Sequence, residues 1–532
     1  MKTLTKTGLM LTLLLAFTIT LHAQEIFDAV RKGDLAKVKE LVGKNPKAVA
    51  ETDNRSFIPL HYAAETGNLS ILEFLLSNNS SIDAKNSAGQ TPLYRAINRN
   101  QMTNANLLMD KGADPFAKAD NGISPINLAA TLKRTVTDRM VNIILKPEVN
   151  ENIKQALLHK IAISNFRDLT KKMITNGVDI FSKNESGGTL LHSVVIGNIA
   201  DIVAELMDKG LKINEKDSLG RTALHYALIG NNTEIAKLLI SKGADLNIRE
   251  ISGRSPLDIA DDWYNTELVN ILEKSGAIRK ERTAYKLENN ASNKPLELKF
   301  LGNSGFLLSY GNKNILYDVP TTIDYGYFDA LPLKAAEMIY NSKKPFDAIN
   351  FILVSHSHSD HIGFDEMASY LRKNPAINMF TTAPTRDSLL KRNNGTELNN
   401  IITIDLAKGK ATQRMENGVE IKFYGLDHGG GLQVLGFILK IDDLKVGFIA
   451  ECDLADLNGT GIENEKIDIL MLNRYFLWDT KQIEHIKKFL NFKYLVPTHL
   501  AKVEIKTRLS DMLKNFPDLI LFRDAMERKI FR

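Results

Sequence analysis

The chain has 532 residues, of which 44 % are hydrophobic and 25 % charged, and its formal net charge is +5. This length allows more than one domain, and the composition is that of folded soluble proteins rather than of disordered or fibrous chains. The small charge does not call for a nucleic-acid partner, and the single cysteine, Cys452, excludes an internal disulfide.

The first residues have the pattern of a secretory signal peptide. Lys2 and Lys6 precede an apolar stretch from Leu9 to Leu21, and Ala23 offers a small residue for cleavage. The apolar stretch is shorter than the roughly 20 residues that span a bilayer, so we expect cleavage to leave no stable membrane anchor. The pattern predicts a signal peptide over residues 1–23 and a bacterial protein that is periplasmic or secreted.

A short motif then recurs with a period of 33 residues through the first half of the chain. Clear copies begin at Gly89, Gly122, Gly187, Gly220 and Gly253, and a degenerate copy surrounds Leu157-Leu158-His159. The copies, such as Gly-Arg-Thr-Ala-Leu-His from Gly220, resemble ankyrin repeats, whose units each carry two short amphipathic helices. The resemblance predicts about eight units over residues 24–277, stacked as an all-α solenoid.

Two roles for the repeats stay open at this point. A stacked array leaves a surface for a protein partner, and it can equally act as a scaffold that stabilises the rest of the chain. His61, His192 and His225 hold the family's Thr-Pro-Leu-His-like position, so we expect them to bond backbone groups rather than to take part in catalysis. Residues 278–294 mix basic, acidic and amide side chains and are predicted to be an exposed linker.

The second half holds a dense cluster of ligand-type residues directly after a predicted buried strand, Phe346 to Val354. In His356-Ser-His358-Ser-Asp360-His361, three imidazoles and a carboxylate fall within six positions. Histidines two apart can converge from an extended loop onto one ion, while Asp360 and His361 suit a second. The cluster therefore predicts a metal site, with two ions.

Further ligands follow at predicted strand ends. His428 and His499 each stand at such a junction, whereas His485 lies in a polar helical pattern and is predicted to be a surface residue. The strand Val446 to Ala450 runs into Glu451-Cys452-Asp453, which offers an anion that could bridge two cations.

Residues 295–532 resemble the metallo-β-lactamase-fold hydrolases. Leu301 to Leu308 and Asn314 to Asp318 look like the family's opening hairpin and its aspartate-bearing strand end, and the H-x-H-x-D-H-x-G signature is present without a gap. The resemblance implies an αββα sandwich that follows the ankyrin repeats. It also implies two divalent metal ions, with Zn²⁺ favoured by the imidazole and carboxylate ligands and Fe or Mn left open.

The resemblance further implies a residue for each ligand position. One ion would be held by His356, His358 and His428, the other by Asp360, His361 and His499, and a carboxylate would bridge them. Side-chain length and the family's use of aspartate favour Asp453 for the bridge, strand length favours Glu451, and Cys452 is a third candidate. We predict Asp453, with Glu451 as the alternative.

These expectations point to a hydrolase that uses a metal-activated water, with Asp360 as the proton acceptor. The substrate is expected to be a small molecule with an ester or phosphoester bond, and Asn303, Arg474 and Tyr475 are candidates for contacting it. One alternative is a binding protein whose metallo-β-lactamase fold has lost activity. A second alternative is a nuclease or phosphodiesterase, against which the signal peptide and the near-neutral charge count.

Overall fold

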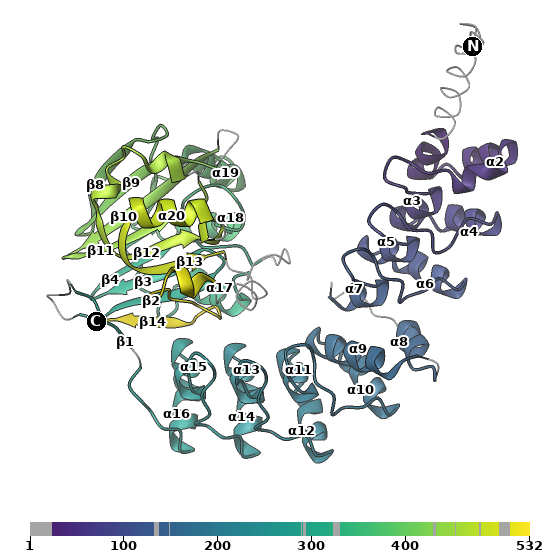
Figure 1. The fold of residues 1–532 in the computed structure, drawn as a ribbon, viewed down its shortest axis with the longest axis horizontal. Helices are drawn as coiled ribbons and strands as arrows, with labels where there is room; N and C mark the ends of the chain where they lie inside the picture. The colour runs from purple at the N-terminus through teal and green to yellow at the C-terminus, as the bar shows by residue number, and fades with distance from the viewer. Residues whose placement is uncertain are drawn as a thin grey trace, which may run out of the picture. The chain divides into compact units, whose positions relative to one another are not determined.

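The computed structural model describes residues 24–532 except 132–137, 148, 283, 289, 291–293, 323–329, 429–431, 453, 478–479 and 500–510. The predicted signal peptide, residues 1–23, therefore lies outside the described residues. The chain divides into two compact units, Met1–Ser255 and Pro256–Arg532 (Figure 1). Within the described residues, no helix has both the length and the apolar character needed to cross a bilayer.

The first unit is built from short helices that follow one another in pairs, as the 33-residue period predicts (Figure 1). Some helices of the second position begin after an asparagine whose side chain accepts from the backbone N–H three residues on, as Asn68 does for Ile71 and Asn232 for Ile235. The described helices are α2 (Leu35–Lys44), η1 (Pro46–Ala50), α3 (Pro59–Thr66), α4 (Leu69–Ser77), α5 (Pro92–Asn98), α6 (Met102–Asp110), α7 (Pro125–Thr131), α8 (Asp138–Ile144), α9 (Glu151–Ile163), α10 (Arg167–Thr175), α11 (Leu190–Ile196), α12 (Ala200–Asp208), α13 (Ala223–Ile229) and α14 (Thr233–Ser241).

Two of the repeat histidines, His61 and His192, bond backbone groups, as predicted. His61 Nδ1 accepts from the Ile58 backbone N–H at 3.2 Å, and its Nε2 lies 3.0 Å from the carbonyl oxygen of Gln90 in the following repeat. His192 makes the same pair of contacts, at 3.1 Å to the Thr189 N–H and 3.1 Å to the carbonyl of Arg221. Each imidazole thus caps its own helix and joins it to the next unit, which leaves no ring nitrogen for catalysis.

The second unit begins with one more helix pair, α15 (Pro256–Asp262) and α16 (Thr266–Lys274), which we call the terminal repeat. It is fastened to the strand-rich domain by charged side chains. Lys299 Nζ donates to the Asp262 carbonyl at 2.6 Å, and Arg528 Nη2 donates to Asp261 Oδ2 at 2.9 Å. Arg282, in the stretch predicted as a linker, binds the Asp262 carboxylate and keeps only 16 % of its side chain exposed.

The rest of this unit is a sandwich of two sheets. One has the strand order β1-β14-β2-β3-β4-β5-β6-β7 and the other β13-β12-β11-β10-β9-β8. The strands are β1 (Ala284–Tyr285), β2 (Leu296–Gly302), β3 (Gly305–Tyr310), β4 (Lys313–Tyr317), β5 (Phe351–Leu353), β6 (Asn378–Thr381), β7 (Ile401–Thr403), β8 (Ala411–Glu416), β9 (Val419–Asp427), β10 (Gln433–Ile441), β11 (Leu444–Ile449), β12 (Lys466–Asn473), β13 (Asn491–Thr498) and β14 (Arg528–Phe531).

Alternate side chains of both sheets point inward and form one aromatic-rich core. Tyr317 from the first sheet and Phe448 from the second pack with ring centroids 4.2 Å apart, and both are buried. Helices cover the outer faces: α17 (Leu333–Tyr340), α18 (Phe364–Lys373) and α19 (Ala383–Arg392) on one side, and α20 (Thr480–Phe489) on the other (Figure 1). This is the αββα sandwich that the sequence predicted, preceded by the all-α repeats.

Candidate metal centre

The candidate site lies where strands of both sheets end. β4 leads to Asp318, β5 to His356, β9 to His428, β11 to Glu451 and β13 to His499. β4 and β5 are parallel, and so are β11, β12 and β13, so their carboxyl ends meet at one edge of the sandwich. Residues far apart in sequence are thereby brought to one place.

The first group of ligand-type side chains consists of His356, His358, His428 and Glu451, whose donor atoms all lie within 4.8 Å of one another. His356 Nε2 and His358 Nδ1 are 3.1 Å apart, and His428 Nε2 is 2.6 Å from Glu451 Oε2. His356 is buried whereas His358 is exposed, so this group is open to solvent on one side.

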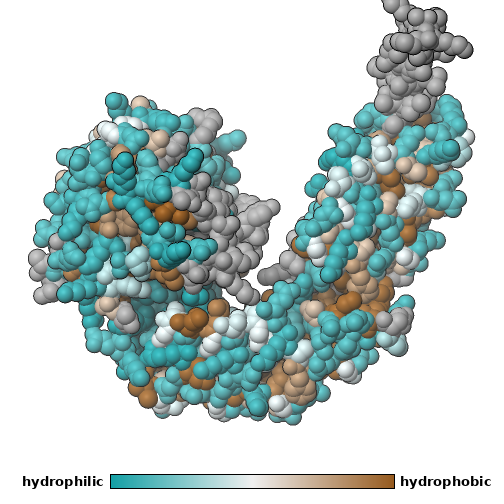
Figure 2. Space-filling model, viewed as in Figure 1, coloured by the Kyte–Doolittle hydropathy of each residue, from teal (hydrophilic) through white to brown (hydrophobic). Residues whose placement is uncertain are grey.

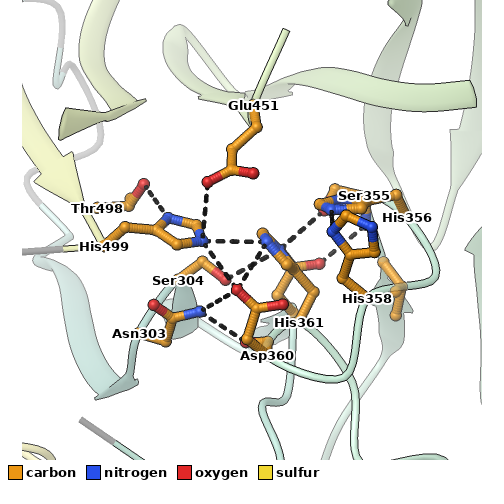
Figure 3. Close-up of polar contacts among 12 residues, drawn as sticks. Asn303, Ser304, Ser355, His356, His358, Asp360, His361, Glu451, Thr498 and His499 are labelled. Carbon is orange, nitrogen blue, oxygen red and sulfur yellow. Dashed lines mark hydrogen bonds and ion pairs between the residues drawn. The ribbon is translucent and has the colours of Figure 1, made fainter. Parts of the chain in front are cut away.

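The second group consists of Asp360, His361 and His499 (Figure 3), and both of its histidines are buried. His361 Nε2 and His499 Nε2 are 3.0 Å apart, and Asp360 Oδ2 lies 3.7 Å from the first and 3.6 Å from the second. Two nitrogen lone pairs at 3.0 Å repel each other, so a proton or a cation between them is needed for stability.

Glu451 stands between the two groups. Its Oε2 contacts His428 of the first group, and its Oε1 is 3.9 Å from His499 Nε2 of the second (Figure 3). Asn473, at the end of β12, holds Oε1 with a 2.9 Å hydrogen bond. The alternative candidate for the bridge is thus in a bridging position, while the preferred candidate, Asp453, lies outside the described residues. Cys452 packs against an apolar cluster on the outer side of the second sheet.

Buried polar side chains fix the imidazole rings. Asp318 Oδ2 lies 2.6 Å from His361 Nδ1, and Ser355 Oγ lies 3.0 Å from His356 Nδ1. His499 Nδ1 lies 3.2 Å from Thr498 Oγ1 and 3.1 Å from Asn473 Nδ2. A proton on Nδ1 of His361, accepted by Asp318, leaves Nε2 as the atom with a lone pair, which is the arrangement that metal binding through Nε2 requires.

The charges within the site favour bound cations. Burial and the neighbouring imidazoles hold the pKa of His356 well below its usual value, and burial also lowers the pKa of His499. Burial acts in the opposite direction on Asp360, but the contacts with His499 and His361 outweigh it and hold the pKa of this carboxyl far below its usual value. Burial lowers the pKa of His361 as well, yet Asp318 outweighs it and raises that pKa. The lowered pKa values of His356 and His499 favour neutral imidazoles beside an ionised Asp360, which is what metal ligation needs.

The donor spacing fits a metal of the size of zinc. Tetrahedral ligands at about 2.0–2.1 Å from Zn²⁺ are separated from one another by roughly 3.3–3.4 Å. The second group has separations of 3.0, 3.6 and 3.7 Å, which bracket that value. The absence of a thiolate from both described groups agrees with Zn²⁺ among imidazoles and carboxylates.

The candidates for substrate contact have other partners. Arg474 is buried and its guanidinium bonds to the backbone carbonyl of His499, and Asn303 is buried and bonds to Asp360. The side chain of Tyr475 lies outside what the structure describes, as does the stretch Tyr325 to Phe328. A cavity of about 590 Å³ lies at the end of β9, and Asp405, Lys408, Asp427 and Gln433 are among its lining residues.

Sequence reasoning did not assign the supporting roles of three residues at the ligands. Ser355 was not singled out, Asp318 was noted only as the strand end of the family resemblance, and Asn473 only beside the substrate candidates Arg474 and Tyr475. Each of the three stands at the end of a strand that leads into the site. His485, predicted to be a surface residue, stacks on Phe489 of α20 and belongs to neither ligand group.

Comparison with known families agrees with this architecture. The family described as "Ankyrin repeats (3 copies)" matches residues 26–119, 158–250 and 216–282, and the "Beta-lactamase superfamily domain" matches residues 327–505. Both matches cover parts of the chain, and they follow the same order as the two kinds of structure described above.

Similar curated proteins match through the repeats. Mouse "Ankyrin repeat and SAM domain-containing protein 6" is 29 % identical over 115 residues, which are 21 % of this chain and 13 % of that protein. Human "Ankyrin repeat domain-containing protein 53" is 37 % identical over 84 residues, 15 % of this chain and 16 % of that protein. Human "Protein phosphatase 1 regulatory subunit 27" is 31 % identical over 101 residues, 19 % of this chain and 66 % of that protein. The chain thus spans only part of each relative, and it carries ankyrin repeats followed by a beta-lactamase superfamily domain.

Proposed function

We propose that this chain is a metal-dependent hydrolase that binds two divalent metal ions, for which zinc is the best fit. The observation that carries the proposal is the position of Glu451 between two groups of ligand side chains, each with the donor spacing of a metal site. Bound ions would supply Lewis acidity, which lowers the pKa of water to about 7 and so makes a nucleophile available at neutral pH.

The proposal gives each ligand residue a role. His356, His358 and His428 would hold the ion on the open side, and Asp360, His361 and His499 the enclosed one, with Glu451 shared between them. Asp360 stays ionised because of its lowered pKa, so it can accept a hydrogen bond from a water and orient it towards the substrate. The exposure of His358 supports entry of the substrate from that side.

The test of metal binding has two parts, and both use the chain from Gln24 to Arg532. Elemental analysis of zinc-replete protein should find close to two tightly bound equivalents, and His499→Gln should lose one of them. His485→Gln is the matched control, because it removes a histidine of the same domain that belongs to neither group. A zinc-replete chain that holds no metal overturns the proposal.

Activity is tested separately. Lactone, thioester, phosphodiester and β-lactam substrates should be screened with the wild type and with Asp360→Asn. Hydrolysis of one of them that fails in the variant supports the proposal, and a phosphodiester as the preferred substrate would favour the nuclease alternative. A chain that binds two zinc ions but cleaves none of these bonds supports the binding-protein alternative instead.

We further propose that the repeats bind a protein partner, as ankyrin arrays commonly do. The visible face of the first unit is mainly hydrophilic with separate hydrophobic patches (Figure 2). Phe181 and Ile196 are exposed large hydrophobic side chains of this unit and are suited to such a contact. Replacing Phe181 and Ile196 with alanine should weaken binding to a protein partner without changing the amount of zinc bound.

Export to the periplasm or medium is proposed from residues 1–23 alone. Fractionation of a bacterial expression host and sequencing of the mature N-terminus test it. The expected result is a protein outside the cytoplasm that begins at Gln24, and an intact cytoplasmic chain contradicts it.

A further inference from the structure

The β2–β3 hairpin has an unusual tip beside the second ligand group. Gly302 and Gly305 pair across the hairpin, and Asn303 and Ser304 form the two-residue turn between them. Gly302 and Asn303 have positive φ angles of 120° and 42°, which glycine and asparagine tolerate best. A Cβ on Gly305 would lie 2.6 Å from the Asp318 carbonyl oxygen, so the tip is pressed against the strand end that carries Asp318.

The tip contacts all three residues of the second group: the side chains of Asp360 and His361, and the backbone of His499 (Figure 3). Asn303 Nδ2 donates to Asp360, at 2.8 Å to its carbonyl oxygen and 3.2 Å to its carboxylate Oδ2. The Asn303 carbonyl accepts from the His499 backbone N–H at 3.1 Å. Ser304 Oγ lies 3.0 Å from His361 Nδ1 and donates to Asp318 Oδ2 at 3.2 Å.

The amide of Asn303 can take only one orientation. If it were turned over, its oxygen would face two oxygens of Asp360 and no donor. The observed orientation leaves Asn303 Oδ1 buried and, among the described residues, without a hydrogen-bond partner. A buried acceptor without a hydrogen bond costs free energy. The hydrogen bonds from Asn303 Nδ2 to Asp360 are therefore present even though they leave Oδ1 without a partner.

Burial rules out a direct substrate contact as the main task of these side chains. Asn303 is 4 % exposed and Ser304 is 2 % exposed. Both are covered, and their polar atoms face the ligands. His499, whose φ of 60° is rare for a histidine, is held at its backbone by the Asn303 carbonyl.

We propose that the Asn303–Ser304 tip is the positioning element of the second metal site. This inference rests on the proposed function and assigns the tip a role in metal binding rather than in substrate recognition. Asn303 would hold Oδ2 of Asp360 near Nε2 of His361 and Nε2 of His499, from which it lies 3.7 and 3.6 Å, and an oxygen with two lone pairs can accept an N–H and still bind a cation. Ser304, with Asp318, fixes the ring of His361 so that Nε2 faces the ion.

The test measures metal affinity in full-length protein, using Zn²⁺ titration against a chromophoric chelator. Asn303→Ala and Ser304→Ala should each weaken the second equivalent of zinc by about 10- to 100-fold, the usual effect of removing a partner of a metal ligand, and leave the first unchanged. Ser304→Ala is the safer variant, since Ser304 does not have a positive φ and alanine fits its backbone.

Asn417→Ala is the matched control. Asn417 also has a positive φ and lies at the tip of a two-residue hairpin, between β8 and β9, but its side chain is exposed and reaches only Glu416 and the Asn350 carbonyl. This variant carries the same backbone penalty and should bind both equivalents normally. Thermal unfolding of all variants shows whether a loss of metal is merely a loss of fold.

A second readout separates positioning from a general structural role. In the Co²⁺-substituted protein, Asn303→Ala should change the visible absorption bands of the second equivalent only. The inference is overturned if the wild type binds two equivalents and both tip variants bind them with unchanged affinity and spectrum, even if KM rises. A wild type that fails to bind the second equivalent instead overturns the proposed function from which the inference starts.

Discussion

Lys299 offers a sharp test of how the terminal repeat is attached to the sandwich. It lies on β2 and is 3 % exposed, its Nζ donates to the carbonyls of Asp262 and Met526, and it sits 5.0 Å from the centre of the Tyr264 ring. Burial lowers the pKa of Lys299 from 10.5 to about 7, which the charge of Asp262 offsets only in part. Lys299→Met keeps the length of the side chain and removes the titration.

The sign follows from the protons bound in each state. Between about pH 7 and 10.5 the unfolded chain holds a proton on Lys299 that the folded chain has released, so the free energy of unfolding rises with pH in this window. The slope approaches about 1.4 kcal/mol per pH unit, and the full window corresponds to about 5 kcal/mol. Between pH 7.5 and 9.5 the wild type should therefore gain about 2 to 3 kcal/mol relative to Lys299→Met. The loss of the hydrogen bonds from Lys299 to the two carbonyls changes the stability of the variant equally at every pH.

Urea unfolding followed by tryptophan fluorescence measures this difference in the full chain. Both tryptophans, Trp263 and Trp478, belong to the second unit, so the signal reports on that unit. Lys440→Met removes an exposed lysine of a strand and serves as the control. Its free energy of unfolding should change with pH as that of the wild type does. If the wild type and Lys299→Met also run parallel from pH 7.5 to 9.5, Lys299 is not buried under the terminal repeat and the reasoning is wrong.

Three further outcomes are expected. Asp360→Asn should lower turnover by about 10²- to 10⁴-fold with a smaller change in KM, and steady-state kinetics that show an unchanged kcat would exclude its role. Glu451→Gln should reduce bound zinc to about one equivalent while Asp453→Asn retains both, as elemental analysis can determine; the opposite result would restore the family-based choice of Asp453. A chain that begins at Pro256 should unfold at the same urea concentration as the second unit of the full chain. A chain that begins at Lys294 should unfold at a lower one, by circular dichroism, because it lacks the contacts of the terminal repeat.

Local patterns made much of the architecture predictable. The 33-residue period depends on contacts between neighbouring units, and it led correctly to the helix pairs, including the degenerate one around His159. The signature from His356 to His361 is equally local, since one loop supplies four ligand-type side chains. The strand-end argument placed His428 and His499 because parallel strands bring their carboxyl ends together, a rule that needs no knowledge of the packing.

Other features depend on contacts that no local pattern contains. Asn303 contacts Asp360, which lies 57 residues further along the chain. The choice of Asp453 followed the family's use of aspartate and stays a prediction, because this residue lies outside the described residues. Glu451, two residues beyond β11, contacts His428. Lys299 alternates with apolar neighbours and looks solvent-facing, yet the terminal repeat covers it.

The attachment of the terminal repeat has a consequence for how such a chain can be altered. Repeat arrays grow and shrink by whole units, because each unit touches only its neighbours. In this chain the boundary between the two compact units lies between Ser255 and Pro256, one repeat before the array ends in sequence. The terminal repeat therefore belongs to the same unit as the sandwich, to which Lys299 and Arg528 attach it. Insertion, deletion or exchange of repeats should be tolerated ahead of Pro256. Replacing the array up to its end in sequence would remove the terminal repeat and its contacts with the sandwich. The segment to transfer into another protein is therefore Pro256–Arg532.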